Sequence, residues 1–334
     1  EPTSYKGLVT GSREKVSYVM SQNQVYFVLS SPLIPGTEIG HHIDKHGDGI
    51  KDVSFSVDNA EKAWEETTNR GAESVSKPKL VEDDKGGAVI ATIKTYGDTT
   101  HTFVQRNDYN GNFLPGFEDI KLKNSGENTG LVHIDHVVGN QPDGIMQPVC
   151  DFYEKVFGWH RFWSVDDNDL STKYSSLRSI VMANDNEKIK MPINEPAKGL
   201  KKSQIQEFVD YYNGAGIQHV AMSTKDIIKT VKKLRSNGVE FLPTPQSYYD
   251  TLLDRVGDLK EDINLLSELG ILVDSDENGY MLQIFTKPIQ DRPTLFYEII
   301  QRKGSNSFGK GNFKALFESI EREQMLPCNL QNNA

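Results

Sequence analysis

Three polar residues in the second half of the chain have the types that a metal site requires and are expected on three separate strands. His136 lies in "HIDHVVGN", His219 in "GAGIQHVAMST" and Glu298 in "TLFYEIIQR", each a strand-like segment. A carboxylate among apolar residues is costly to bury unless it is paired or binds a metal. Two histidines and one carboxylate that leave coordination positions open form the facial triad of non-haem Fe(II) oxygenases. The three residues therefore indicate an iron site with room for a substrate and O2.

Each of these residues also has a simpler interpretation. A single histidine in an apolar strand is more often a hydrogen-bonded core residue than a metal ligand, and a buried glutamate more often pairs with an arginine or lysine. Arg302 follows Glu298 closely in the sequence, and His133 competes with His136 as a ligand. Because His133 and His136 differ by three positions, a regular strand places them on opposite faces. The residues alone leave these alternatives open.

An internal repeat separates what the fold requires from what a site requires. Residues 47–73 and 214–240 match at several Gly, Ile, Val and Glu positions, and each copy predicts a strand followed by a helix. His219 aligns with Asp52, so the histidine occurs in one copy only. Alternation along a strand places neighbouring residues on opposite faces. His219 should therefore point into the concave side of the sheet, while Val220 packs towards the helices.

The ends of the repeated helices carry recognisable signals. Asp58 and Thr224 are the expected N-caps of the two helices. Gly71 and Gly238 lie where the left-handed residue after a helix is expected. A further helix is expected over 148–162.

The repeat predicts an α+β protein with two similar domains, residues 1–118 and 119–334. The division is expected within 107–130, which is rich in Gly and Asn and lacks periodicity. Residues 246–280 are expected to form a helical insertion in the second domain. The first strand and helix of the first domain would precede Glu1, so we expect this N-terminal repeat unit to be incomplete.

Composition narrows the classes of partner. The chain has 37 Lys and Arg against 47 Asp and Glu, a net charge of −10, which argues against a nucleic-acid partner. We expect no membrane span, since no run of about 18 apolar residues occurs. The two cysteines, Cys150 and Cys328, are far apart and favour a reducing, cytoplasmic location.

Six motifs in the second half resemble one family. "IDHVVGN", "PINEP", "GAGIQHVA", "MLQIF", "FYEIIQRKG" and "FGKGNFKALFESIE" occur in this order. They resemble the 4-hydroxyphenylpyruvate dioxygenases, a family of the vicinal oxygen chelate superfamily. The resemblance implies two domains of βαβββ repeats that form open, barrel-like mixed sheets with outer helices. It also implies a C-terminal helix, at about 310–324, that gates the cavity.

The resemblance implies roles for individual residues. His136, His219 and Glu298 match the family's ligands for one Fe(2+) ion per subunit. Three glutamines match catalytic polar residues of the pocket: Gln204, Gln218 and Gln283. Six residues match the substrate-binding wall: Ser179, Asn194, Phe285, Phe296, Phe308 and Phe313.

The implied reaction converts 4-hydroxyphenylpyruvate and O2 to homogentisate and CO2, in tyrosine and phenylalanine catabolism. The substrate carries its own 2-oxo acid group, so no external 2-oxoglutarate is expected. A benzylic hydroxylase similar to hydroxymandelate synthase and a non-catalytic binding protein of the same superfamily are the alternatives. The resemblance also implies a homodimer or homotetramer.

Overall fold

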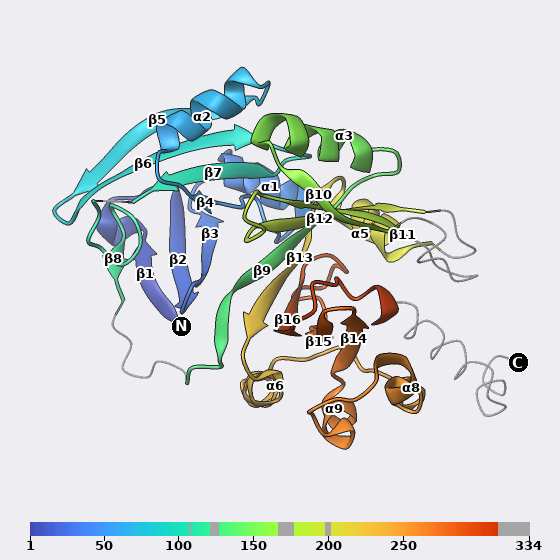
Figure 1. The fold of residues 1–334 in the computed structure, drawn as a ribbon. Coiled ribbons are helices and arrows are strands. Elements are labelled where there is room, and N and C mark those ends of the chain that lie inside the picture. Colours follow the sequence, from blue (N-terminus) through green and yellow to red (C-terminus); the bar gives the residue numbers. More distant parts are fainter. Residues whose placement is uncertain (107, 121–126, 166–176, 198–201, 313–334) are drawn as a thin grey trace, which may run out of the picture.

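The structure is a computed structural model that describes residues 1–106, 108–120, 127–165, 177–197 and 202–312. These residues form three β-sheets with helices packed on their outer faces (Figure 1). The α+β fold expected from the repeat is confirmed. In this part of the chain, every helix is too short or too polar to span a membrane.

Two four-stranded sheets contain the strands of the first half of the chain. The antiparallel sheet has the order β3 (Val25–Pro32), β2 (Lys15–Gln22), β1 (Pro2–Lys6) and β8 (Glu118–Asp119). The mixed sheet has the order β4 (Phe55–Ser56), β7 (Thr100–Gln105), β6 (Gly86–Lys94) and β5 (Ser74–Asp83). The helical elements of this half are η1 (Leu8–Thr10), α1 (Glu38–His46) and α2 (Ala60–Asn69). The boundary proposed after residue 118 therefore falls within β8.

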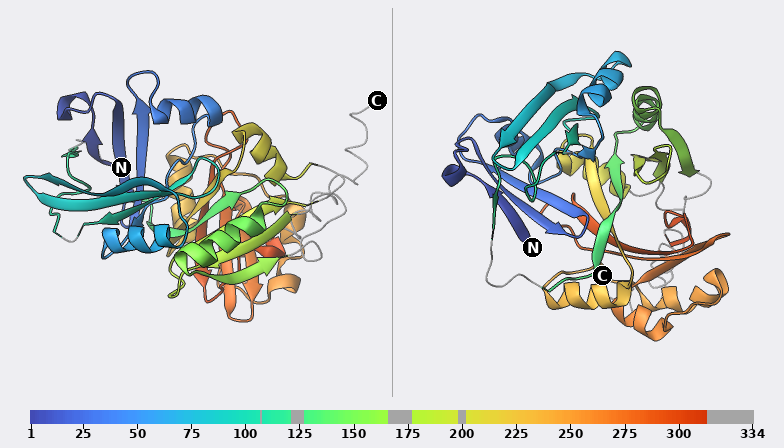
Figure 2. Two further views of the ribbon diagram at one scale, coloured as in Figure 1. Left: turned by 90° about the horizontal axis from the view of Figure 1, so that it is seen from above. Right: turned by 60° about the vertical axis from the view of Figure 1, so that its left-hand side comes forward.

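One eight-stranded sheet contains the strands of the second half. Its order is β10 (His160–Val165), β11 (Leu177–Ala183), β12 (Lys190–Pro196), β9 (Leu131–Asn140), β13 (Gly216–Thr224), β16 (Phe296–Lys303), β15 (Gly279–Phe285) and β14 (Leu272–Asp276). The two first strands of its βαβββ units, β9 and β13, pair antiparallel at the centre. Figure 2 shows the curl of this sheet, with β9 and β13 between its two wings.

The helices of the second half cover the outside of that sheet. They are α3 (Met146–Phe152), α5 (Gln204–Tyr212), α6 (Ile227–Ser236), α7 (Gln246–Tyr249), α8 (Leu252–Val256) and α9 (Ile263–Leu269), and a π-helix, η2 (Tyr153–Phe157), continues α3. The helix expected over 148–162 therefore ends early, because Gly158 adopts a left-handed conformation with φ 71°. The insertion expected to be helical contains α7, α8 and α9, but its last part forms strand β14.

The predicted N-caps of the repeated helices were wrong by one or two residues. Asn59 caps α2, accepting a hydrogen bond from the Lys62 amide at 2.8 Å, and Asp226 caps α6. Asn59 and Asp226 are the last extended residues before each helix, so their side chains are the ones that reach the third helical amide. The glycines were predicted correctly, since Gly71 and Gly238 have φ of 111° and 88°.

The largest apolar core contains residues from both halves of the chain. Phe55, Ile93 and Phe103 of the mixed sheet pack in one cluster with Tyr153 and Ile193 of the second half. His101 joins the halves by a polar contact, with its Nε2 2.7 Å from the Tyr153 hydroxyl. The two repeats are therefore held together by a shared core.

Candidate metal centre

Three neighbouring strands bring the predicted ligands to one place. His136 lies on β9, His219 on β13 and Glu298 on β16, and β13 runs between the other two. Ala221 is paired in register with both His136 and Glu298. Because Ala221 is small and fully buried, the side chains of its two partners can approach each other above it.

The ligand atoms of these three side chains face one another. Glu298 Oε2 lies 3.3 Å from His136 Nε2 and 3.4 Å from His219 Nε2. One ligand atom from each residue lies within 4.8 Å of the other two, and all three residues are buried. The other oxygen, Glu298 Oε1, is buried without a hydrogen-bond partner among the described residues. An unsatisfied buried carboxylate oxygen beside two imidazoles suits a divalent cation.

The electrostatics keep Glu298 ionised despite its burial. Burial alone raises the pKa of this carboxyl, but the charges and hydrogen bonds of His136 and His219 outweigh it and lower the pKa to about 2. For His136, burial lowers the pKa, while Glu298 and Asp135 raise it to about 9. Burial keeps the pKa of His219 below its usual value. Glu298 is thus ionised, and without a metal its charge is balanced by protonated His136, a role that a bound cation would take over.

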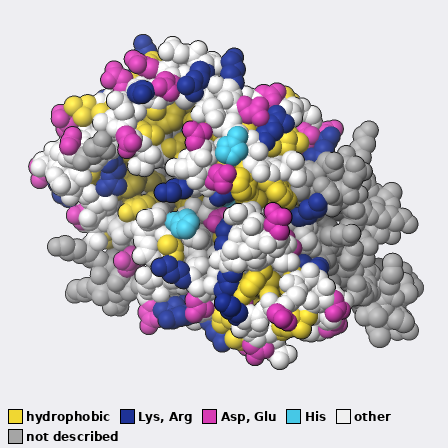
Figure 3. Space-filling view, viewed as in Figure 1, with side chains coloured by type: hydrophobic (Ala, Val, Ile, Leu, Met, Phe, Trp, Pro, Cys, Tyr) yellow, Lys and Arg dark blue, Asp and Glu magenta, His cyan; other side chains and the backbone are white. Residues whose placement is uncertain are grey.

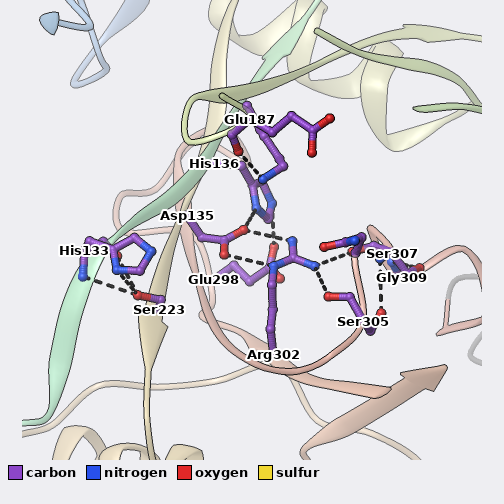
Figure 4. A network of polar contacts seen from close by, with 12 residues as sticks. His133, Asp135, His136, Glu187, Ser223, Glu298, Arg302, Ser305, Ser307 and Gly309 are labelled. Carbon is purple, nitrogen blue, oxygen red and sulfur yellow. Dashed lines mark hydrogen bonds and ion pairs between the residues drawn. The ribbon is translucent and has the colours of Figure 1, made fainter. Parts of the chain in front are cut away.

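Two contacts decide whether Arg302 pairs with Glu298 and whether His133 or His136 faces the centre. Arg302 forms an ion pair with Asp135, with Nη2 2.9 Å from Oδ1, and not with Glu298. His133 is exposed and its Nδ1 lies 2.9 Å from the Ser223 hydroxyl, away from the centre (Figure 4). His136 is therefore the histidine of β9 that faces Glu298.

A small cavity of about 50 Å³ opens beside the three residues. It is lined by His136, His219, Glu298, Ser179, Asn194, Phe285, Phe308, Val138, Trp163, Leu177 and Pro192. The chemistry of this wall is mixed, with two amide or hydroxyl groups and several apolar side chains. Such a combination is typical of sites for small molecules.

Known proteins resemble this chain over nearly its whole length. The model of the Glyoxalase/Bleomycin resistance protein/Dioxygenase superfamily matches residues 133–284. The 4-hydroxyphenylpyruvate dioxygenase of Xenopus tropicalis is 52% identical, over 99% of this chain and 86% of that protein. That of Yarrowia lipolytica is 50% identical, over 98% of this chain and 87% of that protein. The chain belongs to the 4-hydroxyphenylpyruvate dioxygenase family.

Solved structures have the same fold. A triple mutant of 4-hydroxymandelate synthase from Streptomyces coelicolor superimposes with a TM-score of 0.83 and 31% identity, over 97% of this chain and 91% of that chain. A fusion of a xylose isomerase-like TIM barrel with 4-hydroxyphenylpyruvate dioxygenase gives a TM-score of 0.73 at 20% identity, over 96% of this chain and 48% of that chain. The fusion protein supports the fold alone. The resemblance inferred from the motifs is confirmed.

The remaining family positions lie at different distances from the cavity. Phe296 stacks on His219, with ring centroids 4.8 Å apart. Gln218 Oε1 lies 3.1 Å from His219 Nδ1 and so faces the back of that ring. Gln283 is buried close to Gly309. Gln204 is exposed at the first turn of α5, and Phe313 lies outside the described residues.

Four residues of the cavity wall were missed from the sequence. Val138, Leu177 and Pro192 each lie two positions from a residue that was predicted, so strand alternation could have identified them. Trp163 of β10 had no such neighbour, and its place beside Phe308, with ring centroids 5.7 Å apart, depends on the curl of the sheet.

Proposed function

We propose that this member of the 4-hydroxyphenylpyruvate dioxygenase family converts 4-hydroxyphenylpyruvate and O2 to homogentisate and CO2 with one Fe(II) ion per subunit. The observation that carries the proposal is the convergence of His136, His219 and Glu298 at a buried cavity. Two imidazoles and one carboxylate are the donors that non-haem Fe(II) oxygenases use. The relatives named above support the substrate.

Iron held by these residues would supply Lewis acidity for the 2-oxo acid group and redox chemistry for O2. The protein would supply position and a dry environment. His136 and His219 would offer Nε2, because the Nδ1 atom of each ring already contacts Asp135 or Gln218. Only neutral Nε2 atoms can bind a metal, so these contacts select the required tautomer.

Two polar residues would orient the aromatic ring of the substrate. Ser179 and Asn194 lie opposite each other in register on β11 and β12, and both line the cavity. The Asn194 amide donates to Asn140 Oδ1 at 3.3 Å, which holds its orientation. Buried polar groups discriminate strongly, since a ligand without a matching group leaves them unpaired.

Aromatic side chains would exclude water from the same space. Phe285 and Phe308 line the cavity, and Phe308 packs against the ring of His136 at 5.2 Å. We also assign Phe296 and Phe313 to this wall, and Gln204, Gln218 and Gln283 to substrate positioning, from the family resemblance. The gating helix expected at about 310–324 lies almost entirely outside the described residues.

The architecture supports further proposals about the whole protein. We propose a structural domain of residues 1–118 and a catalytic domain of residues 119–334, since all the ligands lie in the second. We also propose a cytoplasmic homodimer or homotetramer. Acidic and basic side chains are intermixed on the face shown in Figure 3, which is consistent with small-molecule rather than nucleic-acid recognition.

Product analysis tests the proposed reaction. The iron-loaded protein with 4-hydroxyphenylpyruvate should consume O2 and form homogentisate, identified by mass and NMR. The 4-hydroxymandelate synthase similarity favours one alternative, benzylic hydroxylation, and 4-hydroxymandelate as product would establish it. Folded, iron-loaded protein that consumes no O2 would instead support the binding protein.

A further inference from the structure

A chain of polar contacts connects His136 to the loop that follows β16 (Figure 4). His136 Nδ1 donates to Asp135 Oδ1 at 2.8 Å. The Arg302 guanidinium holds both oxygens of the same carboxylate, with Nε 2.9 Å from Oδ2 and Nη2 2.9 Å from Oδ1. Arg302 lies four residues after Glu298 on β16, so strand alternation places both side chains on the same face of the sheet.

The other end of this guanidinium binds the loop 304–309. Arg302 Nη1 donates to the backbone oxygen of Ser307 at 2.7 Å and to that of Ser305 at 3.2 Å. This loop carries Phe308, whose ring lies 5.3 Å from the guanidinium carbon and 5.2 Å from the ring of His136. Arg302 therefore contacts both Asp135, which binds the predicted ligand His136, and the loop that carries Phe308 of the cavity wall.

A second anchor holds the loop from the opposite side. Asp276 accepts from the Ser305 hydroxyl at 2.7 Å, the Asn306 amide at 2.8 Å and the Ser307 amide at 3.0 Å. Among the described residues, it forms no hydrogen bond or ion pair with Asp135 or His136. Asp274 adds a third anchor, accepting from the Ser307 hydroxyl at 3.1 Å. Of these three anchors in the described part of the chain, only Arg302 also contacts Asp135.

The pair of Asp135 and Arg302 is well shielded from water. Their side chains are 10% and 20% exposed, so the pair is screened less than a surface ion pair. A planar guanidinium on a carboxylate fixes both groups in orientation, which a single-point contact does not. A carboxylate held in this way fixes the ring and the tautomer of the histidine it binds.

We propose that Arg302 is a positioning residue that serves two parts of the site at once. Through Asp135 it orients His136 for the metal, and through the Ser305 and Ser307 carbonyls it holds Phe308 against the same ring. This inference rests on the proposed metal centre. Its consequence is that ligand geometry and the position of the aromatic wall are coupled by one side chain.

Cobalt(II) binding without substrate tests whether Arg302 orients His136 for the metal. We compare wild type with Arg302→Gln, Asp276→Ala and the control Lys303→Gln, which removes an ion pair with Glu261 from the adjacent position. Arg302→Gln should weaken Co²⁺ binding by about 10- to 100-fold and shift its visible absorption bands. Asp276→Ala and Lys303→Gln should leave affinity and bands unchanged. An equal loss in Asp276→Ala would show that the loop, and not Asp135, carries the effect, and would overturn the proposal.

Hydrogen exchange of the amides at 306–309 tests the loop arm. Exchange should be faster in both Arg302→Gln and Asp276→Ala than in Lys303→Gln, because each loses one anchor. In Arg302→Gln, Co²⁺ binding must weaken and amide exchange at 306–309 must become faster. A change in only one of these two measurements overturns the proposal. Should Arg302→Gln not fold by circular dichroism, Asp135→Asn takes its place, and unchanged Co²⁺ affinity and bands there would equally contradict it.

The same measurements separate this inference from the proposed function. Wild-type protein that binds Co²⁺ but forms no product with iron would contradict the proposed reaction and leave the inference standing. Wild-type protein that binds no Co²⁺ would overturn the metal centre and the inference together.

Discussion

The smallest side chain at the centre has a large effect on its geometry. Ala221 is fully buried and is in register with His136 on one side and Glu298 on the other. It packs in one buried cluster with Met281 and Ile300. A larger residue at this position would push the ligands apart, since packed cores yield little to added volume.

Ala221→Leu tests this role. We expect the free energy of unfolding to fall by about 1–3 kcal/mol from overpacking. Iron occupancy measured by metal analysis should fall, because Glu298 and His136 can no longer meet. Ala221→Gly is the matched control and should retain the metal at similar stoichiometry. Full iron occupancy in Ala221→Leu would show that the centre tolerates a wider spacing.

His219→Ala tests the ligand set. Removal of one of three protein donors should abolish iron binding, while the far-UV circular dichroism stays close to wild type, because the strand keeps its neighbours. The control is His133→Ala on β9, which lies outside the centre and should keep its iron. If His219→Ala retains iron at full occupancy, His219 is not a ligand.

Among the secondary-structure elements, the helix of each repeat begins at a side-chain N-cap, Asn59 for α2 and Asp226 for α6. Asp226 Oδ1 accepts from the Lys229 amide at 3.0 Å at the start of α6. Thr224, two residues earlier, instead accepts from the Asp226 amide at 3.2 Å and so shapes the turn before the helix. Asp226 thus satisfies one amide at the start of the helix that packs on the metal-bearing sheet, and the Gln301 side chain accepts from another, that of Ile227, at 3.0 Å.

Asp226→Ala should lower the free energy of unfolding by about 1 kcal/mol, the usual effect of losing an N-cap. Lys229→Ala is the control, because it changes an exposed side chain and keeps the backbone amide that donates to the cap. Urea unfolding of both variants measures the difference. Equal stabilities would show that α6 does not need this cap.

At the scale of the whole molecule, a buried histidine joins the two halves. His101 of β7 lies 2.9 Å from the Val53 backbone oxygen through Nδ1 and 2.7 Å from the Tyr153 hydroxyl through Nε2. Burial lowers the pKa of His101 to about 4, against opposing effects of Val53 and Asp52. The folded protein therefore holds this ring neutral at pH values where the unfolded chain protonates it.

The sign of the pH dependence follows from that difference. Above about pH 6.5 both states are neutral, and as the pH falls towards 4 only the unfolded state gains the proton. The contribution of His101 to stability should fall by about 2 kcal/mol between pH 7 and pH 5. His42, whose pKa burial and His46 lower to about 4, acts in the same direction.

Denaturant unfolding at pH 7 and pH 5 measures this effect. His101→Gln should remove a large part of the loss of stability on acidification, because it deletes the group that titrates. His41→Gln, at an exposed position of α1, is the control and should keep the wild-type pH dependence. An unchanged pH dependence in His101→Gln would contradict the assignment.

The sequence by itself determined the type of each site residue and the face of the strand on which it lies. Strand alternation and the repeat predicted that the His219 side chain points away from the helices. The motifs predicted the family. Both predictions were possible because both signals lie in short stretches of sequence. Tertiary structure alone decided which residues meet. Ala221 aligns with two ligands, Arg302 pairs with Asp135 and not Glu298, and Trp163 reaches Phe308. These contacts depend on the register of strands that are distant in sequence, and a periodic pattern specifies a face but not a register.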